Sequence, residues 1–124
     1  MVTKNFIDIF FKKKLKKNIL ILSGGRSVKG IYKKIYKSKI CWSKTKIFIL
    51  DERLTKLEKN LNSNMIKKIF KKKCEICDIY KNKVKSNCVA KMIKKNNSLV
   101  ILGMGEDGHF ASIFARSKKF KHLI

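Results

Sequence analysis

The sequence contains no proline and little alanine, and of its 32 basic residues only Arg26, Arg53 and Arg116 are arginine. The scarce residue types have G/C-rich codons, whereas lysine, asparagine, isoleucine and phenylalanine, which are abundant, have A/T-rich codons. Genomic base bias therefore explains much of the net charge of +24. Dedicated nucleic-acid binders more often place arginine at base and phosphate contacts. We therefore expect no specific nucleic-acid partner, while non-specific, salt-sensitive binding is allowed.

Long hydrophobic runs are also missing, and none approaches the length of a membrane-spanning helix. The N-terminal segment "MVTKNFIDIFFKKKLKKNILIL" is interrupted by lysines and lacks a small-residue cleavage site, so it is a poor secretory signal. We expect no membrane association and a cytoplasmic location. A chain of 124 residues is long enough for one domain with a modest core, so we expect residues 1–124 to form a single domain.

The four cysteines do not form a metal-binding pattern. Cys74 and Cys77 make a lone C-x-x-C, with no second pair at zinc-ribbon spacing, and His122 lies far along the chain. A redox C-x-x-C usually opens a helix after a strand, whereas a lysine run precedes this one. We expect reduced thiols and no metal site, and the role of Cys74 and Cys77 stays open.

Three short apolar runs predict buried strands, at Ile19–Leu22, Ile47–Leu50 and Leu99–Leu102. The stretches between them, and the N-terminal segment, carry apolar residues at helical spacing. These helical stripes are Val28, Ile31, Tyr32 and Ile35; Met65, Ile66, Ile69 and Phe70, behind Ser63 or Asn64 as a cap; Val84, Cys88, Val89, Met92 and Ile93; and Phe6, Ile9, Phe10 and Leu15. Strands that alternate with helices predict an α/β fold, a Rossmann-like, mostly parallel sheet flanked by helices.

A polar cluster follows each predicted strand, at the sheet edge where such folds bind ligands. The first is a glycine-bearing turn, Ser23–Ser27, whose backbone N–H groups suit an anion at a helix N-terminus, with Arg26 and Arg53 as further phosphate ligands. The second is Asp51-Glu52-Arg53. The third contains Asp107 and His109, a carboxylate and a base able to take a proton from water. Together they predict a phosphorylated substrate and acid–base chemistry.

The third cluster, "GMGEDG" at residues 103–108, also has the spacing of the dinucleotide-binding fingerprint. That fingerprint requires an acidic ribose-binding residue about 20 positions further on. The sequence there, "RSKKFKHLI", has no acidic residue. A nicotinamide cofactor is therefore not expected.

Four motifs in order, "LSGGRS", Trp42 before "IFILDER", "SN" at Ser63-Asn64 and "LVILGMGEDGHFASIF", resemble the 6-phosphogluconolactonase family. The glucosamine-6-phosphate deaminases are related but carry different residues at these motifs. The resemblance implies cofactor-free hydrolysis of 6-phospho-D-glucono-1,5-lactone to 6-phospho-D-gluconate in the oxidative pentose phosphate pathway. It further implies that His109 activates the water and that Asp51 or Asp107 orients its imidazole. Substrate binding would fall to Ser23, Gly24, Gly25, Arg26, Arg53, Gly105 and Gly108.

The sequence also departs from the family pattern. Val28 and Ala115 stand where prolines are usual, and Ser98 stands where an aspartate usually opens the third strand. Family members continue past the last motif with further strands, so we expect a domain that is incomplete relative to the family. An exposed sheet edge predicts a marginally stable chain that forms homo-oligomers or aggregates. Residues 115–124 are expected to form a flexible tail.

Alternative functions are a glucosamine-6-phosphate deaminase-like isomerase, an inactive remnant, and a lysine-rich nucleic-acid-binding protein. Lactone hydrolysis assayed against glucosamine-6-phosphate deamination would separate the two enzymes.

Overall fold

The computed structural model describes residues 16–53, 55–79 and 81–110. The elements in chain order are β1 (Asn18–Leu22), α2 (Arg26–Tyr36), β2 (Thr45–Ile49), α3 (Asn62–Phe70), β3 (Glu75–Asp78), α4 (Ser86–Lys95) and β4 (Asn97–Ile101), with short 3₁₀ turns at Trp42–Lys44 and Glu58–Asn60. The expected N-terminal helix and the C-terminal tail lie outside the described residues.

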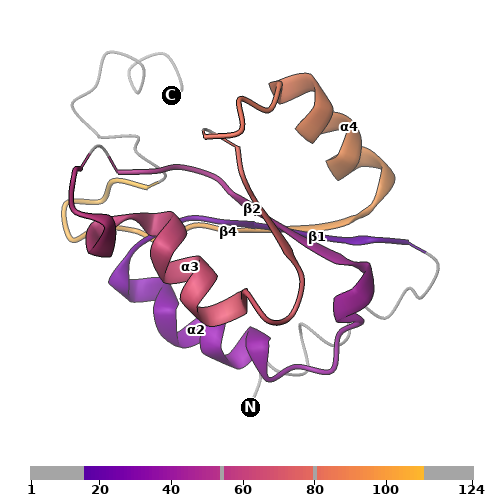
Figure 1. Ribbon diagram of the computed structural model, residues 1–124, viewed down its shortest axis with the longest axis horizontal. Helices are drawn as coiled ribbons and strands as arrows, with labels where there is room; N and C mark the ends of the chain where they lie inside the picture. Colours follow the sequence, from indigo (N-terminus) through magenta and orange to yellow (C-terminus); the bar gives the residue numbers. More distant parts are fainter. Residues whose placement is uncertain (1–15, 54, 80, 111–124) are drawn as a thin grey trace.

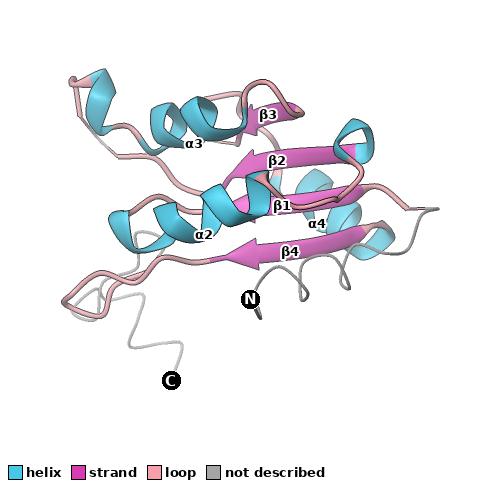
Figure 2. Cartoon of the chain, turned by 90° about the horizontal axis from the view of Figure 1, so that it is seen from below, coloured by secondary structure: helices cyan, strands magenta, loops and turns pink. Residues whose placement is uncertain are grey.

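The four strands form one parallel sheet in the order β3-β2-β1-β4. All strand arrows point the same way in Figure 2, so the segments that follow the strands meet at one edge. β1 is central, and all five of its residues are buried because the sheet is covered on both faces. The predicted α/β fold with a parallel sheet is confirmed.

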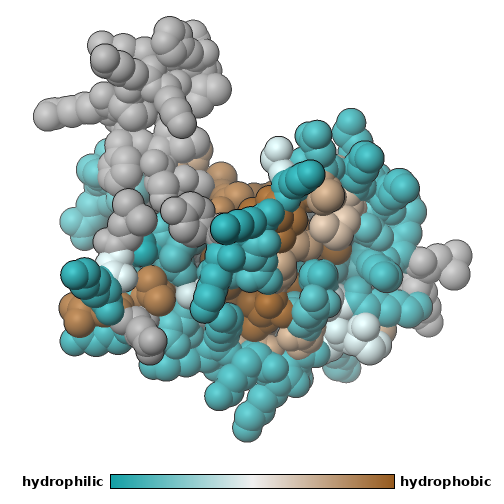
Figure 3. Space-filling model, turned by 45° about the horizontal axis from the view of Figure 1, so that its top comes forward, coloured by the Kyte–Doolittle hydropathy of each residue, from teal (hydrophilic) through white to brown (hydrophobic). Residues whose placement is uncertain are grey.

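Helices cover the two faces unequally, with α2 and α3 on one face and α4 on the other (Figure 1). The larger core lies under α2 and α3, where the Phe70 ring packs 6.0 Å from Tyr32, 6.4 Å from Tyr36 and 5.9 Å from Trp42, measured between ring centroids. The smaller core is centred on Ile19, Ile21, Phe48 and Cys77. Figure 3 shows hydrophobic side chains gathered on the side of the molecule that α4 only partly covers.

The three predicted strands are present, shifted by one or two residues at their ends, and the sequence did not predict β3. Only Ile76 and Cys77 are apolar in this four-residue strand, which lies at an edge of the sheet. Cys77 is buried in β3, and burial together with the Glu75 charge raises the pKa of Cys74 to about 11. These positions make Cys77 part of the core and Cys74 a weak nucleophile.

The start of α3 differs from the expected capping by Ser63 or Asn64. The helix begins at Asn62, so both residues lie inside its first turn, and no side chain of the N-cap position bonds the helix. Instead, the carboxylate of Glu52, from a distant part of the chain, accepts the backbone N–H groups of Asn62 and Ser63. The expected capping was wrong because the helix starts earlier, at Asn62, where the N–H groups of Asn62 and Ser63 donate to the charged Glu52 carboxylate.

The stripe predicted for α4 is only partly buried. Val89 and Met92 pack against the smaller core, and Val84 does so from just before the helix. Cys88 and Ile93 are exposed. Among the described residues, none of the helices is long and apolar enough to span a membrane.

Candidate functional site at the carboxyl edge of the sheet

The loops after β1 and β4 contact each other directly. The Gly103 N–H donates a hydrogen bond to the Ser23 hydroxyl at 2.7 Å, and the Ser23 N–H donates to the Ile101 carbonyl at 3.1 Å. Tyr32 of α2 donates its hydroxyl hydrogen to the Ser23 carbonyl at 2.6 Å. Ser23 itself is only 2% exposed. Its side chain therefore joins the first and third polar clusters of the sequence.

The glycine-bearing turn leads into the N-terminus of α2. Gly25 is the N-cap residue, and neither a capping side chain nor an acidic residue in the first turn neutralises the backbone N–H groups. Arg26 opens the helix and is exposed. The end of α2 at the sheet edge therefore carries positive charge from both the helix dipole and a guanidinium group.

The second cluster is tied to α3 through Glu52. Its carboxylate accepts the N–H groups of Asn62 at 2.6 Å and Ser63 at 3.0 Å, together with that of Arg53 at 2.9 Å. Partial burial alone would raise the pKa of Glu52, but the hydrogen bonds from Ser63, Arg53 and Asn62 outweigh it and hold that pKa below its ordinary value. The Arg53 residue is exposed, and Asp51 is partly buried beside it.

Asn62 joins the first two clusters, and the sequence did not mark it as a site residue. Its Nδ2 donates to the Asp51 carbonyl at 3.2 Å. Its side chain also fills the space in front of Gly24, where a Cβ atom would overlap the Asn62 amide. Only glycine permits this approach. The one available signal was the position of Asn62 next to the Ser63-Asn64 motif.

The loop after β4 holds the histidine and carboxylate of the third cluster as a pair. Asp107 Oδ1 bonds His109 Nδ1, and it also accepts the His109 backbone N–H at 3.3 Å. The loop is closed by hydrogen bonds from Gly105 N–H to the His109 carbonyl at 2.8 Å and from Gly108 N–H to the Gly105 carbonyl at 2.9 Å. A Cβ atom on Gly105 would overlap the imidazole. Because Gly105 has no side chain, the His109 imidazole can occupy the space beside it.

The electrostatics of this pair favour an ionised carboxylate. The hydrogen bond from the His109 side chain, followed by that from its backbone N–H, lowers the pKa of Asp107. Asp107 is exposed and His109 is partly buried. An ionised carboxylate at this position favours the tautomer with its proton on Nδ1, the tautomer in which Nε2 is the basic nitrogen of the ring.

The structure therefore brings the predicted site residues to one edge, with hydrogen bonds or close contacts linking the three loops. In this arrangement the Asp107 carboxylate is bonded to the imidazole of His109. Ser23 differs from the other predicted binding residues because its hydroxyl is occupied within the scaffold.

This geometry is that of a parallel α/β sheet with polar loops at the carboxyl ends of its strands, the edge at which α/β folds of this kind bind their ligands. The family profile described as glucosamine-6-phosphate isomerases/6-phosphogluconolactonase matches residues 11–123. The chain belongs to this family.

Relatives identified by sequence similarity agree with the assignment to this family. A probable 6-phosphogluconolactonase of Dictyostelium discoideum is 37% identical over an alignment of 121 positions, covering 79% of this chain and 49% of the relative. The 6-phosphogluconolactonase of Thermotoga maritima is 28% identical, covering 79% of this chain and 50% of the relative. The chain thus spans about half the length of the curated relatives it matches.

Solved structures show the same fold. A crystal structure of 6-phosphogluconolactonase from Thermotoga maritima superimposes with a TM-score of 0.66 at 25% identity, over 91% of this chain and 58% of that one. A 6-phosphogluconolactonase from Shewanella baltica gives a TM-score of 0.65 at 19% identity, over 98% of this chain and 57% of that one. The second likeness supports the fold alone.

Proposed function

We propose that this chain carries the lactone-hydrolysing site of a 6-phosphogluconolactonase, which converts 6-phospho-D-glucono-1,5-lactone to 6-phospho-D-gluconate. The observation that carries the proposal is the bonded Asp107–His109 pair on the loop after β4, a loop that Gly103 joins to the glycine-bearing turn at the N-terminus of α2. Family membership and the names of the relatives support the same activity. The reaction needs no cofactor.

The proposed reaction begins with water activated by His109. Nε2 takes a proton from the water as its oxygen forms a bond to the lactone carbonyl carbon, and Asp107 stabilises the resulting imidazolium. The tetrahedral intermediate then collapses, the bond to the ring oxygen breaks, and the imidazolium returns the proton to that oxygen. The products are the open-chain hydroxyl and a carboxylic acid, which ionises in water.

Two negatively charged parts of the reacting substrate, the phosphate and the developing oxyanion, need binding groups. The phosphate is proposed to lie at the N-terminus of α2, bound by backbone N–H groups of Gly25 and its neighbours and by Arg26 and Arg53. The oxyanion that develops at the carbonyl needs donors placed for it, and we assign these to backbone N–H groups of the loop at 103–108. Ser23 and Gly24 contribute by fixing the shape of the turn.

The proposal is tested by following loss of the lactone above its spontaneous hydrolysis, with the full chain and with His109→Gln. General-base catalysis of this kind contributes about 100-fold or more, so H109Q is expected to fall to near the uncatalysed rate while keeping its melting temperature. Full activity in H109Q would disprove the mechanism. Deamination of glucosamine-6-phosphate by the same preparation, without lactone hydrolysis, would favour the isomerase branch of the family.

A further inference from the structure

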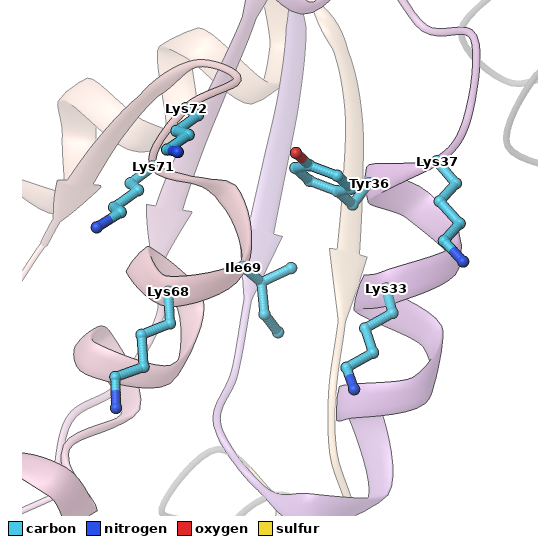
Figure 4. Close-up of a pocket in the computed structure, with 7 residues that line it drawn as sticks. All are labelled: Lys33, Tyr36, Lys37, Lys68, Ile69, Lys71 and Lys72. Carbon is cyan, nitrogen blue, oxygen red and sulfur yellow. The ribbon is translucent and has the colours of Figure 1, made fainter.

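A basic groove lies between the C-terminal ends of α2 and α3, away from the carboxyl edge of the sheet. Its volume is about 530 Å³, which is within the usual range for ligand sites. Figure 4 shows the side chains that line it: Lys33, Tyr36, Lys37, Lys68, Ile69, Lys71 and Lys72. We call it the lysine groove.

The lysines form two rims with a less polar floor between them. Lys33 and Lys37 come from the α2 side, while Lys68, Lys71 and Lys72 come from the α3 side. Tyr36 and Ile69 lie between the two rims (Figure 4). No acidic side chain lines the groove, and within the described part of the chain neither ion pair involves these lysines.

The dipoles of the two helices neutralise only a small part of the positive charge of these lysines. Each helix C-terminus carries about −0.5 of a charge, so the two together offset about one of the five positive charges of the rims. A surplus of about four charges remains in one groove. A ligand with several negative charges spaced along its length would neutralise it.

The floor favours a ligand that also has flat, apolar groups. Tyr36 is partly exposed; its ring lies 6.4 Å from that of Phe70 between centroids, and the Lys73 ammonium covers part of it from 4.7 Å above the centroid, which leaves the rest of the ring for a stacked base. Aromatic surface between basic rims is how proteins bind single-stranded nucleic acid without reading its sequence, since the phosphates follow the charge and a base stacks on the ring.

We propose that the lysine groove binds single-stranded nucleic acid without sequence specificity. The site goes beyond the proposed lactonase function and is separate from it. Helix α2 has 11 residues, so its C-terminus lies about 16 Å from the N-terminus assigned to the substrate phosphate. The phosphate backbone lies along the two rims, and one base stacks on Tyr36.

The test measures binding of a fluorescein-labelled oligouridylate to the full chain by anisotropy, as a function of salt. The groove variant combines Lys33→Gln, Lys68→Gln and Lys72→Gln. Its matched control removes the same charge from the opposite face of the sheet, with Lys91→Gln, Lys94→Gln and Lys95→Gln on α4. All six lysines are exposed, so both triple variants should retain the wild-type melting temperature.

Counterion release sets the expected result. Each phosphate contact contributes about 0.7 to the slope of log affinity against log salt, so the groove variant should lose about 2 from that slope and bind about 100-fold more weakly at 0.1 M salt. The control variant should change affinity by less than about threefold. Equal losses in the two variants would overturn the proposal, because net charge alone would then explain binding.

The aromatic floor is tested separately with Tyr36→Leu against Tyr36→Phe. Loss of one stacked base weakens binding by about 1–3 kcal/mol, or roughly 5- to 150-fold, so Y36L should fall in that range and Y36F should bind like the wild type. Inorganic polyphosphate is the competitor. If Y36L has no effect and polyphosphate displaces the oligonucleotide at equal phosphate concentration, the groove is a polyphosphate site and the proposal is wrong.

Discussion

The carboxylate of Glu52 is expected to stabilise the whole carboxyl edge, and its removal gives a direct test of how that edge is built. The two N–H groups it accepts from α3 belong to Asn62 and Ser63, which are 6% and 7% exposed. Loss of a helix cap costs about 0.5–2 kcal/mol, and a hydrogen bond to a charged group contributes about 1.5–3 kcal/mol. Because water can reach part of the site, we expect Glu52→Ala to lower the free energy of unfolding by about 2–4 kcal/mol.

Glu52→Gln keeps one acceptor oxygen but places an NH₂ group against the remaining donors. We expect it to cost about 1–2 kcal/mol, which for a chain of this size lowers the melting temperature by on the order of 5 °C. The measurement is chemical denaturation and thermal melting followed by circular dichroism. Glu75→Gln is the matched control, since Glu75 forms an exposed ion pair with Lys46 at 2.9 Å. Such pairs contribute about 0–1 kcal/mol.

The pH dependence of the stability difference between wild type and E52Q gives a second, independent test of the role of Glu52. The folded chain holds the pKa of Glu52 below its ordinary value of 4.5, so the unfolded chain binds more protons near that pH. This stabilisation is fully present above the unfolded pKa and is lost as pH falls through the folded one. The stability gap between wild type and E52Q should therefore narrow on acidification from about pH 6 to about pH 3. If E52Q and E75Q melt alike at neutral pH, the assigned role of Glu52 is refuted.

Three further outcomes are expected. Asp107→Asn should lower the rate of lactone hydrolysis about 100-fold. The control variant Glu106→Gln, which changes the exposed neighbouring carboxylate, should keep the rate within about twofold of the wild type. Equal rates in the two variants would show that the Asp107–His109 pair does not act in catalysis. Ser23→Ala leaves the Gly103 N–H without its acceptor and should cost about 1–2 kcal/mol in denaturant unfolding, and an unchanged midpoint would contradict this. In the described part of the chain β4 pairs on one side only and its Val100 is 47% exposed, so light scattering should detect oligomers that Val100→Lys shifts toward monomer.

Local patterns in the sequence are sufficient to predict β1, β2 and β4, three strands of the sheet. β1 is buried on both faces, and an uninterrupted apolar run is what such a strand requires. β3 could not be predicted from such a pattern, because it pairs on one side with β2 and has only two apolar residues. Its strand structure depends on register with β2, which is a tertiary contact and leaves no periodic signal.

The candidate site shows the same division between local and distant information. The rule that parallel strands end at one edge places Ser23 and Gly103 together although they are 80 positions apart. The capping of α3 was not predictable in this way, because Glu52 lies ten positions before Asn62, the first residue of α3 whose N–H it accepts. Any polar residue near a helix start is a candidate cap, and only the folded arrangement shows that a charged acceptor displaces the local ones.

The contacts that shape the candidate site hold its three loops together within the described residues. Gly103 is bonded to Ser23, Asn62 joins Gly24 to the Asp51 carbonyl, and Glu52 fixes the start of α3. The pair of Asp107 and His109 is then positioned by hydrogen bonds within its own loop. Each link lies between residues 23 and 109, and most involve backbone groups of the loops after β1, β2 and β4 or of the first turn of α3. The arrangement of the loops is therefore a property of this part of the fold, and activity measurements on H109Q and D107N test the chemistry of the pair separately from its position.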